Sequence, residues 1–187
     1  FIKLKKNKRF IFFYFDHKQL NISNKKKLFK LVNKLKPDII INFAAFTDVN
    51  LAEIKIKKSF NVNYQGVKYL SLISKKFNIL LIHFSTDYVF DGNKKISYSE
   101  RSKTNPLNVY GYHKLLSENI IRKNCKRFFI FRTSSVFSSN NINFVKKIIK
   151  SIKTNQKLFI PNDQTSCPTS SIFICKRIYF IINKYHS

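Results

Sequence analysis

Residues 79–92 read ILLIHFSTDYVFDG and give the clearest indication of the fold. The run from Ile79 to Ser85 is almost continuously apolar, as expected for a strand buried on both faces of a parallel sheet. Thr86 and Asp87 follow it directly. Ligands of open α/β sheets bind beyond the carboxyl ends of the strands. The stretch therefore predicts a buried strand that ends at a binding edge, although Thr86 and Asp87 could also simply cap a turn.

Three more apolar runs have the same character, namely Phe10–Phe15, Ile39–Phe43 and Phe128–Arg132. Segments with a helical pattern alternate with these runs, at Lys26–Leu35, Ser59–Lys76, Tyr110–Asn124 and Asn143–Ile152. Repeated strand–helix–strand order predicts an α/β, Rossmann-like, doubly wound parallel sheet. The pattern loosens toward the end, so we expect a nucleotide-binding domain over residues 1–156 and the start of a substrate lobe over residues 157–187.

The composition excludes some classes of protein. An apolar share of 44% in 187 residues fits a globular domain. The net charge of +27 would favour nucleic acid, but the lysines are dispersed along the chain and form no localised basic stripe, so solvated helix faces explain them better. No apolar run approaches membrane-spanning length. The three cysteines have no metal-type spacing, which favours reduced thiols and the cytoplasm.

The sequence holds three Tyr-x-x-x-Lys pairs, and context must choose among them, because so lysine-rich a chain produces such pairs by chance. Tyr14 lies within a strand pattern, where residues four apart do not meet as they do on a helix. Tyr64 follows no polar strand end. Tyr110 opens a helix after the Ser85–Asp91 segment, and Lys114 lies one turn further on. The pair Tyr110 and Lys114 is therefore the candidate for chemistry.

An ammonium beside a phenol favours the phenolate and lowers the tyrosine pKa from about 10. Such a tyrosine can exchange a proton with a carbonyl oxygen near neutral pH. Protonation of a ketone oxygen while hydride reaches its carbon is the chemistry of a carbonyl reductase. We therefore expect Tyr110 to serve as the acid, with Lys114 lowering its pKa.

Five ordered segments together resemble the dTDP-4-dehydrorhamnose reductase family of extended short-chain dehydrogenases. They are Lys36–Asp48, Ser85–Gly92, Asn105–Lys114, Arg132–Ser134, and Asp163-Gln164 with Pro168-Thr169. The resemblance implies that Thr86, Tyr110 and Lys114 are the catalytic trio, in which Thr86 binds the substrate C4 carbonyl, Tyr110 donates the proton and Lys114 holds the nicotinamide ribose. It also implies hydride transfer from NADPH or NADH to a dTDP-sugar, in the route to dTDP-L-rhamnose and cell-surface polysaccharide.

The resemblance also implies two sets of binding residues. The expected cofactor-binding residues are Asp16, His17, Asn21, Ile22, Ala44, Ala45, Thr47, Tyr110 and Lys114. The expected substrate residues are Thr86, Asp87, Tyr88, Asp163, Gln164, Pro168 and Thr169. Some positions keep another interpretation: His17 and Lys18 read equally well as an exposed turn, Ala44 and Ala45 as a packing site, and Asn63 as a structural residue. The family also allows a homodimer and Mg²⁺, whose ligands the sequence does not locate.

The chain departs from the family pattern in several places. No glycine precedes Gly66, so we expect the first strand and the glycine-rich phosphate loop to lie before Phe1, and the chain to be incomplete at both ends. Ser135 stands where the family has tryptophan, and Ser166 where it usually has glycine. Two other functions stay open: another nucleotide-sugar epimerase or dehydratase, and a non-catalytic regulatory subunit of the methionine adenosyltransferase type.

Overall fold

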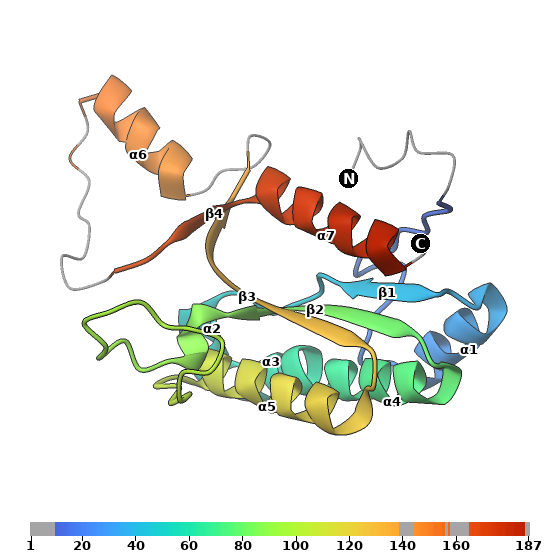
Figure 1. Cartoon of the computed structure of the whole chain (residues 1–187). Coiled ribbons are helices and arrows are strands. Elements are labelled where there is room, and N and C mark those ends of the chain that lie inside the picture. Colours follow the sequence, from blue (N-terminus) through green and yellow to red (C-terminus); the bar gives the residue numbers. More distant parts are fainter. Residues whose placement is uncertain (1–9, 139–143, 156, 158–164, 186–187) are drawn as a thin grey trace. The chain divides into compact units, whose positions relative to one another are not determined.

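The computed structural model describes residues 10–138, 144–155, 157 and 165–185 (Figure 1). Its sheet has the strand order β1-β2-β3-β4, in which the strands are Ile39–Asn42, Leu80–Thr86, Phe128–Phe137 and Pro168–Ser170. β1 pairs in parallel with β2, from Ile39 opposite Leu80 to Asn42 opposite His83, and β3 pairs in parallel with β4. Helices flank this sheet, which confirms the predicted Rossmann-like α/β fold.

The chain divides into two compact units, one comprising residues 14–132 and the other residues up to Phe13 together with those from Thr133 onward. β3 runs through the boundary between Arg132 and Thr133. The expected domain boundary after residue 156 stays a prediction. Each unit is described by itself below.

The larger unit contains most of the helices. They are α1 (Lys25–Leu35), α2 (Val49–Ile54), α3 (Ile56–Phe60), the π-helix η2 (Asn61–Gly66), α4 (Val67–Phe77), the 3₁₀ turn η3 (Asp87–Val89) and α5 (Val109–Asn124). Side chains of Asn24, Asp48 and Asn108 cap α1, α2 and α5 by accepting backbone N–H groups. α1 and α4 end on Lys36 and Asn78, which have left-handed φ values of 44° and 54°.

The core of this unit lies between the helices and one face of the strands. Leu28 and Val32 of α1, Leu70 and Ile73 of α4, and Leu81 of β2 belong to one buried cluster. Figure 1 shows α1, α4 and α5 running along the same face of β1 and β2. Because side chains alternate along a strand, His83 and Ser85 follow Leu81 onto this helix-covered face. β2 therefore turns His83 and Ser85 toward α5.

The opposite face of the strands carries an aromatic stack. The ring of Phe84 lies between Phe43 and Phe131, with centroid separations of 4.8 and 5.3 Å and interplanar angles of 14° in both pairs. The three rings come from the end of β1, from β2 and from β3. This stack holds the carboxyl ends of the strands in register, next to Thr86.

The helix predicted at Ser59–Lys76 is longer than expected and is interrupted by the wider turn of η2. The interruption places Asn63 and Gly66 in the interior. A Cβ on Gly66 would lie 2.6 Å from the Ile22 side chain, so the helix packs closely against Ile22, and any larger residue would require that side chain to shift. Wide turns of this kind occur frequently at functional sites, and no sequence pattern had indicated one here.

One prediction about elements is wrong. Phe10–Phe15 forms no strand in the described part of the chain, because apolar character reports β-propensity and burial but does not by itself give the backbone the geometry of a sheet. α2 was not anticipated. The remaining predicted strands and helices are confirmed to within a few residues, except that Asn143 lies outside the described residues and β3 extends to Phe137.

The smaller unit contains α6 (Phe144–Lys153), β4 and α7 (Ser171–Tyr185). α7 buries Ile174, Ile178 and Ile182, which recur at helical spacing. The register between β3 and β4 shifts between Ser134 and Val136, where Ser135 has a left-handed φ of 43°. The position at which the family resemblance expected tryptophan is thus an exposed serine at a β-bulge.

Candidate active site

Lys114 is almost completely buried on α5, with 1% of its surface exposed. Its ammonium donates a hydrogen bond to the main-chain carbonyl of Phe84, and its Nζ lies 3.4 Å from Nε2 of His83. Burial lowers the pKa of Lys114 to about 8, although the nearby carboxylate of Glu118 acts to raise it. The lysine is therefore held against the end of β2 and can lose its proton at mildly alkaline pH.

Tyr110 lies one turn before Lys114 and is also buried. Its hydroxyl is hydrogen-bonded to the side chain of Thr86, and its ring packs edge-to-face against Tyr88 at a centroid distance of 5.8 Å. Thr86 is the last residue of β2 and is buried as well. The structure thus brings Thr86, Tyr110 and Lys114 together at the carboxyl end of a central parallel strand, where this fold binds ligands.

The pKa of Tyr110 shifts in the direction opposite to the one expected. Burial raises it, the hydrogen bond with Thr86 lowers it, and the charges of Asp87 and Tyr88 raise it. Lys114 directs its ammonium at a backbone carbonyl instead of at the phenol. The prediction of a lowered pKa was wrong, because spacing on a helix indicates neighbourhood but not burial. Tyr110 is consequently a neutral phenol at pH 7 and holds a proton that it can donate.

Gly111 allows the helix to approach the turn that follows β2. A Cβ at this position would lie 2.1 Å from the carbonyl oxygen of Tyr88. The backbone N–H of Gly111 donates to the Asn108 side chain at 2.7 Å, which fixes the first turn of α5. The contact between Gly111 and Tyr88 therefore sets the distance at which Tyr110 meets Thr86.

The turn after β2 is itself hydrogen-bonded. The Thr86 hydroxyl donates to Oδ1 of Asp87 at 3.1 Å and accepts the backbone N–H of Tyr88 at 3.3 Å. Asp87 is partly exposed, and 41% of Tyr88 is exposed. Both predicted substrate residues, Asp87 and Tyr88, therefore follow Thr86 directly in the chain. Through its hydrogen bonds, Thr86 links the buried phenol of Tyr110 to the carboxylate of Asp87, which reaches solvent.

The loop after β1 carries the small residues expected to line a cofactor. Ala44 and Thr47 are exposed and Ala45 is partly exposed. Asn63 of η2 is fully buried and binds the backbone of this loop. Its Oδ1 accepts the N–H of Phe46 at 2.9 Å, and its Nδ2 donates to the Phe46 carbonyl at 3.0 Å. Asn63 therefore has a structural role, and it holds the loop open toward the carboxyl edge of the sheet.

The expected cofactor-binding residues between Asp16 and Ile22 behave differently from one another. Asp16 and Gln19 each accept the other's backbone N–H through their side chains, so Asp16 is an exposed turn residue. Oδ1 of Asn21 accepts the N–H of Ser23 at 2.9 Å. The Ile22 side chain belongs to the buried core, which leaves only the backbone of this residue available to a cofactor.

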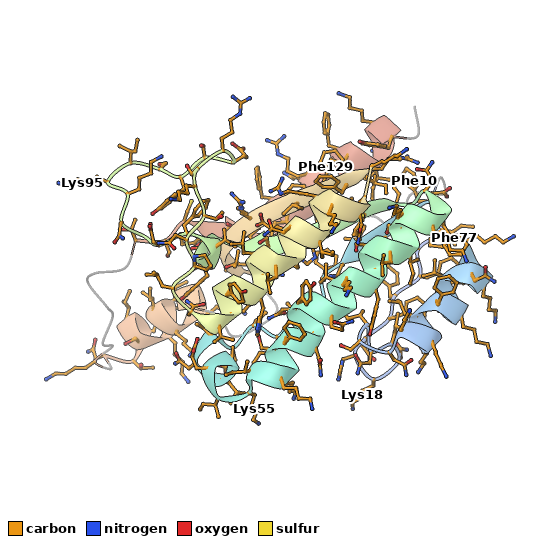
Figure 2. All side chains as sticks on the ribbon, turned by 90° about the horizontal axis from the view of Figure 1, so that it is seen from below. Phe10, Lys18, Lys55, Phe77, Lys95 and Phe129 are labelled. Carbon is orange, nitrogen blue, oxygen red and sulfur yellow. The ribbon has the colours of Figure 1, made fainter. Side chains whose placement is uncertain are left out.

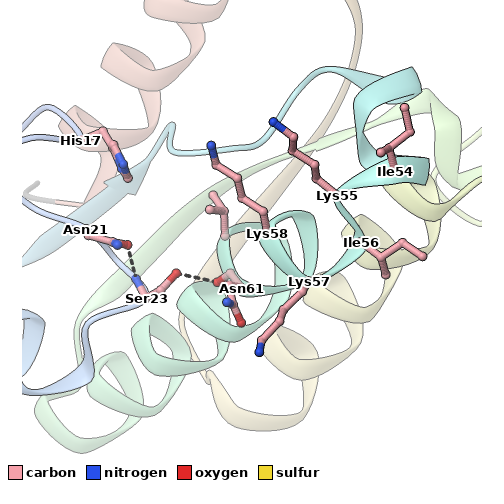
Figure 3. Close-up of a pocket in the computed structure, with 10 residues that line it drawn as sticks. His17, Asn21, Ser23, Ile54, Lys55, Ile56, Lys57, Lys58 and Asn61 are labelled. Carbon is pink, nitrogen blue, oxygen red and sulfur yellow. Dashed lines mark hydrogen bonds between the residues drawn. The ribbon is translucent and has the colours of Figure 1, made fainter.

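His17 and Asn21 line an open pocket of about 610 Å³ (Figure 3). Its other wall comes from the segment Ile54–Lys58 and from Asn61 and Val62. Figure 3 shows Lys55 and Lys58 pointing the same way, whereas Lys57 points away from them. Room of this size beside an imidazole and lysine ammoniums fits the adenosine end of a dinucleotide. No pattern in the sequence indicated that Lys55 and Lys58 would line a pocket, because they lie at and just after the junction of α2 and α3, which was not predicted.

The lysines in general are dispersed, as expected. Figure 2 shows Lys18, Lys55 and Lys95 projecting outward from separate parts of the larger unit. Among the described residues, no group of three or more His, Cys, Asp or Glu side chains is placed to hold a metal ion, so the allowance for Mg²⁺ has no support in this structure. Of the described helices, none is long and apolar enough to cross a membrane.

The remaining predicted substrate residues belong to the smaller unit. Pro168 and Thr169 form β4, and the Thr169 hydroxyl donates to the carbonyl of Cys167 at 3.1 Å. Asp163 and Gln164 lie outside the described residues.

Sequence reasoning missed a set of buried polar residues beneath Lys114. Glu118, one turn after Lys114, accepts two hydrogen bonds from Arg132 of β3, at 2.9 and 2.7 Å, and one from Arg122 at 3.2 Å. Desolvation raises the pKa of Glu118, but hydrogen bonds from Arg132 and Ser85 and the charge of Arg132 outweigh it and leave the pKa below its ordinary value. The i, i+4 spacing from Lys114 was the available signal, and it placed Glu118 on the buried face.

Comparison with known proteins gives a consistent family. A profile described as the RmlD substrate binding domain matches residues 2–187. A curated dTDP-4-dehydrorhamnose reductase of Aggregatibacter actinomycetemcomitans is 37% identical over 165 residues, which are 88% of this chain and 56% of that protein. This chain thus spans about half the length of the curated relatives that it matches.

Two solved structures are similar in fold and sequence. A dTDP-4-dehydrorhamnose reductase of Clostridium acetobutylicum superposes with a TM-score of 0.91 at 32% identity, over 98% of this chain and 65% of that one. The corresponding Bacillus anthracis structure, in complex with NADP, has a TM-score of 0.89 at 29% identity, over 96% of this chain and 65% of that one. The likeness extends along nearly the whole chain.

Proposed function

This chain belongs to the RmlD substrate binding domain family, and from that membership we propose that the protein is an NADPH-dependent dTDP-4-dehydrorhamnose reductase. The reaction is reduction of the C4 ketone of dTDP-4-dehydro-L-rhamnose to dTDP-L-rhamnose. One observation carries the proposal: a buried, neutral Tyr110 is hydrogen-bonded to Thr86 at the carboxyl end of β2, one helical turn from a buried Lys114. Such an arrangement suits delivery of a proton to a carbonyl oxygen.

Tyr110 and Thr86 both act on the carbonyl oxygen of the substrate, in different roles. Thr86 donates a hydrogen bond that orients the oxygen, and Tyr110 transfers its phenolic proton to it. NADPH, when bound, supplies the hydride that reaches C4, so that the C=O group becomes CH–OH. In the free protein the Thr86 hydroxyl donates to Asp87, which reaches solvent, so the site borders on water, from which Tyr110 regains its proton after the product leaves.

Several residues of the larger unit would hold the cofactor. Lys114 would bind the nicotinamide ribose, and the loop at Ala44–Thr47 would lie along the dinucleotide. His17 and Asn21 would face the adenosine, in the pocket that Lys55 and Lys58 also line. The positive charge there favours a 2′-phosphate and hence NADPH, in keeping with the NADP bound to the Bacillus anthracis relative.

Asp87 and Tyr88 would contact the sugar, and Asp163, Gln164, Pro168 and Thr169 would shape the nucleotide-sugar pocket. A location in the cytoplasm and assembly as a homodimer complete the proposal.

The test is oxidation of NADPH by the protein in the presence of dTDP-4-dehydrorhamnose. We expect one NADPH consumed for each ketone reduced. Tyr110→Phe should lower the rate by about 10²-fold or more, because the acid is lost. Tyr112→Phe is the matched control, since this tyrosine is 52% exposed on the same helix and should retain the rate.

Each competing function predicts a different result. An epimerase would convert a nucleotide sugar without net consumption of NADPH, and a regulatory subunit would bind a methionine adenosyltransferase and reduce no ketone. Wild-type protein that leaves NADPH unconsumed, or a Tyr110→Phe variant with full activity, would refute the reductase.

A further inference from the structure

His83 has no part in the chemistry above, yet it is fully buried on β2 directly beneath Lys114. Its Nδ1 lies 3.1 Å from Nδ2 of Asn42, the last residue of β1. Its Nε2 lies 3.1 Å from Oγ of Ser117 and 3.4 Å from Nζ of Lys114, both on α5. One imidazole thus contacts two strands and the helix that carries Tyr110 and Lys114.

The hydrogen bond on each side of His83 has a direction that the surrounding atoms fix. Oδ1 of Asn42 accepts the backbone N–H of Ala44 at 3.1 Å, so the Asn42 side chain turns its NH₂ group toward the imidazole. That group can only donate, and Nδ1 of His83 must therefore accept.

The contacts of Nε2, on the other side of the ring, indicate the same tautomer. The Ser117 hydroxyl donates to the main-chain carbonyl of Lys114 at 2.6 Å, which leaves its oxygen to accept a proton from His83. Nε2 must therefore carry the hydrogen. The hydrogen bonds therefore form one continuous chain. It begins at the N–H of Ala44, passes through the side chains of Asn42, His83 and Ser117, and ends at the carbonyl of Lys114, and each polar atom in it has a consistent role as donor or acceptor.

We propose that His83, as its neutral Nε2–H tautomer, is a positioning residue that ties the loop after β1 to α5 and leaves the Lys114 ammonium directed at the Phe84 carbonyl. The one hydrogen on Nε2 is donated to Ser117, so Nε2 has no lone pair with which to accept a hydrogen bond from the ammonium. The ammonium therefore donates to the main-chain carbonyl of Phe84. The relevance of this to catalysis rests on the proposed function, because it assumes that Lys114 binds the cofactor.

The charges around Lys114 agree with this assignment. Burial, followed by the charge of Lys114, holds the pKa of His83 well below its ordinary value, so the imidazole stays neutral. Burial likewise lowers the pKa of Lys114 to about 8. Glu118 on α5 acts the other way, but its carboxylate is engaged by Arg132 of β3 and by Arg122. Tyr110, on the turn before, is neutral.

The tautomer can be read directly by ¹⁵N NMR of the imidazoles in the protein without cofactor. The chain has four histidines, and the His83 signals are assigned by their loss in His83→Gln. We expect a bare nitrogen at Nδ1 and a protonated nitrogen at Nε2 across neutral pH. A proton on Nδ1, or a doubly protonated ring at pH 7, would overturn the proposal, and both results are read on the wild-type protein, with His83→Gln used only to assign the signals.

Asn42→Asp tests the link through the ring. The carboxylate replaces a donor with an acceptor, so the His83 hydrogen should move to Nδ1 and Nε2 should become an acceptor that faces the ammonium. The same ¹⁵N measurement reads this change directly. Asn50→Asp adds the same charge at an exposed position of α2 and should leave the tautomer unchanged.

A folded Asn42→Asp protein in which His83 keeps its hydrogen on Nε2 would overturn the proposal, as would the same tautomer change in Asn50→Asp. The proposed function fails separately. If wild-type protein shows the Nε2–H tautomer and the tautomer responds to Asn42→Asp, but NADPH is not oxidised, the reductase is refuted and the positioning role of His83 stands.

Discussion

Gly111→Ala should separate Tyr110 from Thr86 without removing either side chain. The new Cβ would lie 2.1 Å from the carbonyl oxygen and 2.9 Å from the carbonyl carbon of Tyr88. Since Cβ contacts below 3.0 Å are essentially never seen, the gap must open by about 1 Å. Backbone blocks the site, so no side-chain rotation can relieve the clash, and the start of α5 has to move away from η3.

The magnitude follows from two opposed effects. Overpacking of a closed site costs roughly 1–3 kcal/mol, and a backbone obstacle places this change at the upper end. Alanine in a helix is more favourable than glycine by about 1 kcal/mol. The net loss of unfolding free energy should therefore be about 2 kcal/mol. For the reaction, a misplacement of about 1 Å costs on the order of 10²-fold in rate.

Denaturant unfolding of the protein, followed by circular dichroism, measures the first quantity, and NADPH oxidation measures the second. Gly66→Ala is the matched control, because its closest contacts would be with side-chain atoms, Cγ1 and Cδ1 of Ile22 at 2.6 and 2.7 Å, and the nearest backbone atom would lie 3.3 Å away. It should lose less stability and keep its rate. Gly111→Ala with wild-type stability and rate would refute the argument that this contact sets the site.

Three further predictions concern α5. Glu118→Gln should destabilise the protein by about 3 kcal/mol in urea unfolding, because it leaves the Arg132 charge buried without its carboxylate. The control is Arg122→Gln, which should cost under about 1 kcal/mol because the Arg122 side chain is 50% exposed. Equal losses in the two variants would contradict this interpretation. The pKa of Glu118 lies below its ordinary value, so its contribution is complete above the unfolded pKa of about 4.3 and is lost as pH falls through the folded pKa. Acid unfolding of wild type should therefore be steeper below about pH 4 than that of Glu118→Gln, and parallel acid curves would contradict the assignment. Asn108→Ala removes the helix cap and should cost about 1 kcal/mol, whereas Asn119→Ala at an exposed position should cost little; both are measured by thermal unfolding, and equal melting temperatures would argue against the cap.

The fold was largely predictable, because buried parallel strands are read from apolar runs and the helices between them from their periodicity. Ile79–Ser85 and Lys26–Leu35 were placed to within one residue at each end. Phe10–Phe15 was not, since an apolar run reports burial or β-propensity but does not report the presence of a neighbouring strand. The π-turn at Asn61–Gly66 depends on the contact with Ile22, which is 39 residues away from the start of that turn in the sequence.

The site was predictable in position but not in electrostatics. Tyr110 and Lys114 could be paired by spacing, and Thr86 could be placed at the strand end that faces them. The direction of the Tyr110 pKa shift depends on how much water reaches the phenol, which spacing does not report. His83 looked like one more residue of an apolar strand, because its partners are far away in the sequence: Asn42 becomes a neighbour through the register of β1 and β2, and Ser117 through the packing of α5 on β2.

The backbone at Lys36 and Asn78 is strained, so substitution there can raise the stability of the protein. Each adopts the left-handed backbone that closes a helix, and for a residue with a Cβ this conformation costs roughly 1–2 kcal/mol, less for asparagine. With only three glycines in the sequence, α1 and α4 are closed without them. Lys36→Gly is therefore the first change that an engineer seeking a sturdier scaffold should make, since it removes backbone strain at the end of α1 and alters no side chain of the candidate site.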